Sequence, residues 1–198
     1  LPPDFEAFKS SAAATDDPDK HCKVGFNYWG AGQHADAVEW FMKAANKNHA
    51  EAQAAMARAY MVGLGVDRDK EACVRYGTLS VDQDCAAGKV LLGFCYMTGW
   101  AVDKDLAKAE TLMREAAEQD DPVAGLLCRL KGWGVEKMSQ EDAVALGNAQ
   151  SPLVEFAIGE LLVDSGGDDL YVPNLPRAKW HYGRARLESV PQAEQAEM

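Results

Sequence analysis

Residues 52–81, AQAAMARAYMVGLGVDRDKEACVRYGTLSV, and residues 88–117, GKVLLGFCYMTGWAVDKDLAKAETLMREAA, decide the fold, because the two stretches align without a gap. The offset is 36 residues, as the step from Tyr60 to Tyr96 shows. Self-similarity at such a period is typical of stacked helix pairs, since a single pair cannot bury its apolar face without its neighbours. The sequence therefore predicts an all-α solenoid.

The repeat divides the chain into about five predicted units of two antiparallel helices each. An N-terminal cap or short helix over residues 1–19 precedes the predicted solenoid, which covers residues 20–188, and a polar, flexible tail over residues 189–198 follows it. The second and third units show the pattern most clearly, whereas the first, fourth and fifth match it in part. The expected units span approximately residues 20–50, 51–84, 85–121, 122–150 and 151–188.

The turn inside each unit has residues that a helix hairpin needs. Gly63 and Gly99 are predicted to end the first helix in the left-handed conformation, which glycine adopts at low cost. Asp69 and Asp105 are predicted to cap the second helix, because a carboxylate accepts hydrogen bonds from the free N–H groups there. Recurring small residues are expected to let neighbouring helices pack closely: Ala37, Cys73, Ala109, Ala44, Ser80 and Ala116.

Composition limits the classes of partner. The 198 residues include 31 acidic and 20 basic side chains, a formal net charge of -11, which would repel a nucleic-acid backbone or an anionic membrane surface. No apolar run approaches the roughly 20 residues of a membrane-spanning helix, and no signal-peptide pattern opens the chain. The start at Leu1 instead of methionine fits either a mature exported protein or a trimmed chain.

The five cysteines are an odd number, so at least one thiol has no partner within the chain in an oxidising compartment. Cys73 and Cys95 each lie eleven residues from Asp84, and a turn there would place them face to face across a hairpin as a possible disulfide. In the alternative, which the alanines at the equivalent positions favour, Cys73 fills a slot for a small apolar side chain.

The repeated residues of the second and third units, among them the glycines and aspartates of the turns, resemble the SEL-one-like repeat, a relative of the tetratricopeptide repeat. The resemblance implies a right-handed superhelix of antiparallel helix pairs that serves as an adaptor or partner-binding surface and has no catalytic residues. Ala101 replaces the second glycine of the family's turn, and Ser80 and Val81 stand where the family's disulfide partner of Cys85 would be. The third unit carries the pattern in Leu92, Gly93, Tyr96, Gly99, Val102, Asp105, Lys108, Ala109, Ala116 and Ala117.

No motif for catalysis or cofactor binding is present, so we expect no enzyme, no metal and no cofactor. The four histidines are scattered and are predicted to lie on the surface: His21, His34, His49 and His181. The paired acids around Asp69 and Asp105 are explained by helix capping, and the acidic loop near residues 164–169 lacks the ligand order of a calcium loop.

Two sets of side chains are candidates for partner binding. Trp100 and Trp133 occupy the same variable position of the turn, and each ring either points outward as an anchor or folds back over its hairpin. The family's usual contact positions, on the inner face of the superhelix, correspond to Phe26, Arg58, Phe94 and Glu160, with Trp29 and Met97 close by.

The sequence-based hypothesis is a bacterial solenoid that binds another protein and performs no chemistry. We expect it in the periplasm or outside the cell, with a cytoplasmic location left open. Its acidic character would suit a basic partner, as in an immunity protein that neutralises a secreted, type VI-like antibacterial effector. The alternative is a structural or regulatory adaptor that holds together an envelope or signalling assembly.

Overall fold

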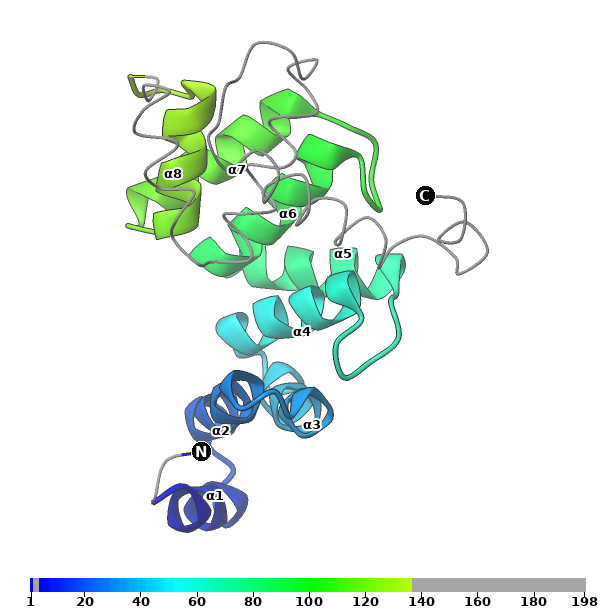
Figure 1. Ribbon diagram of the computed structural model, residues 1–198, viewed down its shortest axis with the longest axis vertical. Helices are drawn as coiled ribbons and strands as arrows, with labels where there is room; N and C mark the ends of the chain where they lie inside the picture. Colours follow the sequence, from blue (N-terminus) through cyan, green and yellow to red (C-terminus); the bar gives the residue numbers. More distant parts are fainter. Residues whose placement is uncertain (2–3, 137–198) are drawn as a thin grey trace, which may run out of the picture. The chain divides into compact units, whose positions relative to one another are not determined.

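The computed structural model describes residue 1 and residues 4–136, and this part of the chain contains eight α-helices and no β-strand (Figure 1). The predicted all-α helical solenoid is therefore confirmed. The predicted tail, the fifth unit and residues 137–150 of the fourth unit lie outside the described residues. The helices are α1 (Phe5–Ala13), α2 (Pro18–Gly30), α3 (His34–Ala45), α4 (Ala50–Val62), α5 (Lys70–Val81), α6 (Ala86–Thr98), α7 (Leu106–Glu118) and α8 (Pro122–Lys131).

Two compact units divide the chain, Leu1–Asp121 and Pro122–Met198, and α8 opens the second. In the first unit, α2 packs on α3, α4 on α5 and α6 on α7, so each predicted hairpin forms. Successive pairs are joined by contacts of α3 with α4, α5 with α6, and α4 with α6 (Figure 1). The contact between α4 and α6 places the first helices of two repeats next to each other.

The turn residues act as the sequence predicts. Gly63 and Gly99 have φ values of 79° and 76° and end α4 and α6 in the left-handed conformation. An Asp69 carboxylate oxygen accepts the backbone N–H of Ala72 at 2.8 Å at the start of α5. Asp105 makes the equivalent bond at the start of α7, at 3.0 Å. The same chemistry therefore sets the helix bounds in both repeats.

Small residues let three helices approach closely in the core. The Ser80 hydroxyl, at the end of α5, donates to the Ala50 carbonyl at 2.9 Å at the start of α4. Gly88, near the start of α6, lies so close that an added Cβ would be 2.4 Å from the Ser80 oxygen. This close contact explains why a small residue is needed at position 80, since any larger side chain would push α6 away.

The prediction of surface histidines is wrong for His21, which is buried at 6% relative exposure. Its Nε2 lies 3.1 Å from the carbonyl oxygens of Ala12 and Thr15 at the end of α1, and its ring contacts Trp40 at 5.4 Å between centroids. The ring is buried because it hydrogen-bonds carbonyls at one helix end and packs on a second helix.

Cys73 and Cys95 lie face to face across the hairpin of α5 and α6, as their spacing predicts. The Cys73 thiol donates a hydrogen bond to Cys95, and this bond together with burial raises the pKa of Cys73. Both thiols are buried, and neither is in a disulfide in the described part of the chain. The contact shows that the two side chains can meet, while the disulfide itself stays a prediction.

Candidate functional site

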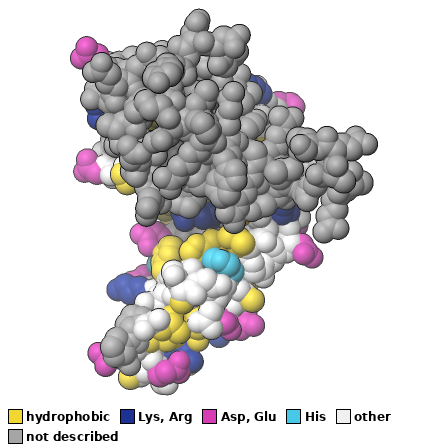
Figure 2. Space-filling model, in the orientation of Figure 1, with side chains coloured by type: hydrophobic (Ala, Val, Ile, Leu, Met, Phe, Trp, Pro, Cys, Tyr) yellow, Lys and Arg dark blue, Asp and Glu magenta, His cyan; other side chains and the backbone are white. Residues whose placement is uncertain are grey.

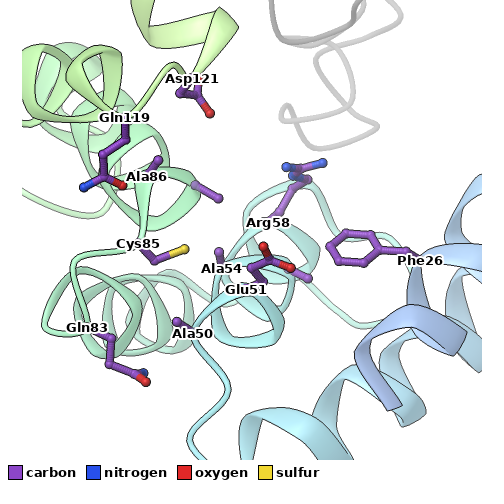
Figure 3. Close-up of a pocket in the computed structure, with 12 residues that line it drawn as sticks. Phe26, Ala50, Glu51, Ala54, Arg58, Gln83, Cys85, Ala86, Gln119 and Asp121 are labelled. Carbon is purple, nitrogen blue, oxygen red and sulfur yellow. The ribbon is translucent and has the colours of Figure 1, made fainter. Parts of the chain in front are cut away.

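A groove of about 590 Å³ opens on the first unit where α2, α4 and α6 approach one another (Figure 3). Two turns complete its wall, one between α5 and α6 and the other after α7. We call it the α4 groove, because α4 supplies five of the residues that line it. Its lining residues are Phe26, Ala50, Glu51, Ala54, Ala55, Arg58, Gln83, Cys85, Ala86, Ala87, Gln119 and Asp121.

The periodicity of α4 creates the groove. Ala50, Ala54 and Arg58 follow one another at four-residue steps and therefore share one face of the helix. The alanine side chains of α4 are too short to fill the space above this helix. The start of α6 also presents short side chains there, Ala86 and Ala87, so the space stays open. The result is an apolar floor with a single guanidinium at one end.

Among the described residues, Arg58 is the one basic side chain that lines the groove, which also contains the carboxylates of Glu51 and Asp121. Its Nε is buried and has no hydrogen-bond partner within the described part of the chain. Burial lowers the pKa of Arg58, an effect that the nearby Asp121 carboxylate opposes. A guanidinium remains charged in any protein setting and has five N–H donors to satisfy. Arg58 is thus a largely desolvated cation that lines the groove and has one N–H group without an acceptor in the described part of the chain.

The wall of the groove on the α2 side is formed by the aromatic ring of Phe26. The Phe26 ring is 42% exposed and packs edge-on against Phe41 at 5.0 Å between centroids. Figure 3 shows the Phe26 ring on the side of α4 opposite Cys85, with Arg58 and Glu51 between them. An apolar floor, an aromatic wall and a cation suit an extended polypeptide segment, which offers apolar side chains and carbonyl or carboxylate acceptors.

The structure brings together two of the predicted inner-face residues, Phe26 and Arg58. Trp29 lies half-buried against His34, with their centroids 4.7 Å apart. Phe94 and Met97 are each only 2% exposed and do not line the groove. Glu160 lies outside the described residues. The role of these residues in partner binding stays a prediction.

The two tryptophans have different surroundings. Trp100 is half-buried and packs against the core cluster of the first unit, with the Lys70 ammonium 6.0 Å from its ring centroid. Trp133 is half-buried in the second unit, where its backbone N–H donates to the Cys128 carbonyl at 2.9 Å. For Trp100 the structure favours the ring that folds back over the helices.

Sequence reasoning missed the polar rim of the groove. Gln83, Gln119 and Asp121 come from turns between helices, where no apolar pattern marks a position. One signal could have found part of it, because His49, Cys85 and Asp121 share a single repeat position at the 36-residue offset. Each residue at that position precedes the first helix of its repeat, so the three lie along the same edge of the array.

Apolar and acidic side chains occupy different parts of the visible surface of the described residues. On the face seen in Figure 2, hydrophobic side chains gather over the N-terminal helices, while most Asp and Glu side chains stand at the margins. Among the described residues, Cys22, His49 and Glu51 form a group of metal-binding type, with ligand atoms all within 4.8 Å of one another. No helix of the described part is long and apolar enough to cross a membrane.

Comparison with known proteins supports the repeat assignment. The family model described as "Sel1 repeat" matches residues 33–49, 50–85 and 86–121. An uncharacterised protein of Neisseria meningitidis serogroup B is 30% identical over 83 residues, which are 42% of this chain and 18% of that protein. The chain therefore spans less than a fifth of this relative's length.

Two crystal structures align with this chain. A Sel1 repeat protein from Oxalobacter formigenes aligns with a TM-score of 0.53 and 25% identity, over 66% of this chain and 98% of that one. A protective antigen of uropathogenic Escherichia coli with an SLR fold aligns with a TM-score of 0.46 and 17% identity, over 91% and 56% of the two chains.

Proposed function

We propose that this protein, which is built from Sel1 repeats, is a non-enzymatic scaffold whose α4 groove binds an extended segment of another protein. Sel1 repeats are protein-interaction repeats, and the matched ones cover α4 and α6, two of the three helices that form the groove. The proposal places the contact on the face where α4 and α6 lie next to each other.

One observation carries the proposal, namely that the groove-lining Arg58 has a buried Nε with no acceptor among the described residues. A buried donor left without a partner costs about 1–3 kcal/mol, and a bound carbonyl or carboxylate would recover much of that cost. Phe26 adds an exposed aromatic surface within the same groove. Aromatic and arginine side chains in such settings are the usual energetic centres of interfaces.

For the biological role, we propose an exported or periplasmic immunity protein that neutralises a secreted antibacterial effector. The net charge of -11 supports this role, because a strongly acidic chain attracts a basic partner and accelerates its association. In such a complex the acidic surface would steer the partner, and the α4 groove would then fix one of its segments.

The test is quantitative binding of the captured partner to groove variants. The wild-type chain is used to isolate partners from the native organism, and the affinity of each purified partner is measured by calorimetry. Phe26→Ala and Arg58→Gln should each weaken binding about tenfold or more, as expected for a loss of roughly 1.4 kcal/mol at a central contact.

Matched controls come from outside the groove. Leu79→Ala and Arg114→Gln remove an exposed leucine and an exposed arginine that do not line it, and both should leave the affinity unchanged. A thermal melt of each variant separates lost binding from lost folding. Equal affinity of the partner for wild type and both groove variants would refute the groove as the binding site. Capture of several weak partners in place of one tight partner would favour the adaptor role over the immunity role.

A further inference from the structure

Three side chains of metal-binding type meet where the first two helix pairs join. Cys22 lies on α2, His49 caps the start of α4, and Glu51 is in the first turn of α4. Their ligand atoms all lie within 4.8 Å of one another, close enough to converge on one ion with small side-chain adjustments. We propose that Cys22, His49 and Glu51 bind a divalent transition-metal ion of the zinc class.

The hydrogen bonds of His49 prepare the ring for this role. Its Nε2 lies 3.0 Å from an Asp19 carboxylate oxygen and donates to it. Its Nδ1 accepts the Ala52 backbone N–H at 3.2 Å. The neutral tautomer with its electron pair on Nδ1 is therefore already selected, and an ion at Nδ1 would replace the capping bond. A carboxylate that holds the distal N–H is the arrangement found around zinc-binding histidines.

The donor set selects the ion. Thiolate sulfur, imidazole nitrogen and carboxylate oxygen together suit Zn²⁺ far better than Mg²⁺ or Ca²⁺, which prefer oxygen alone. A thiolate and a carboxylate carry two negative charges, which balance the charge of a divalent ion. Three protein ligands leave a fourth tetrahedral position for water.

The surroundings of Cys22 show what the ion would change. Cys22 is 2% exposed, and burial first and the Glu51 carboxylate second raise its pKa to about 12. Zinc binds the thiolate form of cysteine, so ion binding would release the thiol proton to solvent. Binding should accordingly weaken as the pH is lowered.

The site would also join two parts of the solenoid. Cys22 belongs to the first helix pair, whereas His49 and Glu51 belong to the second, so one ion would clamp α2 to the start of α4. Glu51 in addition lines the α4 groove. The residues lie 27 and 29 positions apart in sequence, which explains why no ligand spacing was visible along the chain.

The experiment is a titration of the full chain, free of any affinity tag and stripped with a chelator, with ZnCl₂ in competition with a chromophoric chelator. One equivalent should bind with micromolar or tighter affinity, and the melting temperature should rise on binding. Titration with Co²⁺ should produce a thiolate-to-cobalt charge-transfer band. His49→Asn, which keeps a good helix-capping residue, should weaken zinc binding at least tenfold.

Further variants distinguish the proposed zinc ligands from a nearby cysteine that is not a ligand. Cys22→Ser should abolish the cobalt band, and Glu51→Gln should weaken zinc binding at least tenfold. Cys85→Ser is the matched control, because Cys85 lines the nearby groove but is not one of the three ligands, and it should bind as wild type does. No zinc binding by the folded wild type at 100 µM ion, or wild-type affinity in His49→Asn and Glu51→Gln, would overturn the proposal.

Discussion

At the scale of single residues, equivalent turn positions of the two clearest repeats differ in backbone strain. Gly65 has a φ of 78°, and a Cβ there would lie 2.3 Å from the His34 carbonyl oxygen, so only glycine fits. Ala101 occupies the equivalent position with a φ of 66°. The left-handed conformation costs a residue with a Cβ about 1–2 kcal/mol, which makes Ala101 a strained position.

Ala101→Gly should therefore stabilise the protein by roughly 0.5–1 kcal/mol, the relief of strain less the greater chain entropy of glycine in the unfolded state. Urea unfolding measures the change. Ala107→Gly, at an exposed helical alanine of α7, is the control of opposite sign and should lower stability, because glycine disfavours helix. Destabilisation by Ala101→Gly would show that the turn gains nothing from glycine.

The turn before α6 contains an ion pair that should make stability depend on pH. Asp84 pairs with the ammonium of Lys89, which is 4% exposed and lies 3.0 Å from a Glu115 oxygen. The hydrogen bond from Lys89 lowers the pKa of Asp84. A carboxyl with a depressed folded-state pKa stabilises the fold above its unfolded pKa of about 3.9, and this stabilisation is lost as the pH falls through the folded pKa.

Asp84→Asn removes the charge but keeps a residue that tolerates the left-handed φ of 61° found there. The variant should melt at a lower temperature than wild type at about pH 7, and the difference should vanish at about pH 2. Melting curves over this range measure it. Asp82→Asn, at an exposed residue of the same turn, controls for the substitution itself. A difference that stays constant across the pH range would contradict the assignment.

At the scale of helices, most of the first unit was predictable from sequence. The 36-residue period determines the hairpins, and glycine and aspartate at fixed positions determine where α4, α5, α6 and α7 end or begin. These features are local, so a single sequence contains them. The burial of His21 was not predictable, because it depends on how α1 packs on α2, and α1 carries no repeat pattern.

Close helix packing gives a direct prediction at this scale. Gly88→Ala would place a methyl group 2.4 Å from the Ser80 oxygen and 3.1 Å from the Val81 backbone nitrogen, and a rigid backbone cannot yield cheaply. The substitution should cost about 2 kcal/mol by overpacking. Gly30→Ala is the matched control, because a Cβ there meets nothing within 4 Å. Denaturant unfolding that ranks the two variants equally would contradict the packing of α6 on α5.

At the scale of the whole molecule, the groove was predictable only in part. Phe26 and Arg58, assigned to the inner face from their repeat positions, both line the groove, whereas Phe94, at the position equivalent to Arg58, is buried and does not. Gln119 and Asp121 were missed, since their place depends on how one repeat stacks on the next. The metal-binding group was missed for the same reason, as its residues come from two different helix pairs.

The central claim is that the α4 groove holds a segment of the partner through Arg58. The most direct measurement is the nuclear magnetic resonance signal of the Arg58 Nε–H group in nitrogen-labelled protein, recorded with and without the isolated partner. The signal should shift and become slower to exchange with water when the partner binds, while that of Arg114, outside the groove, stays unchanged. A partner that binds without moving the Arg58 signal would contradict the account.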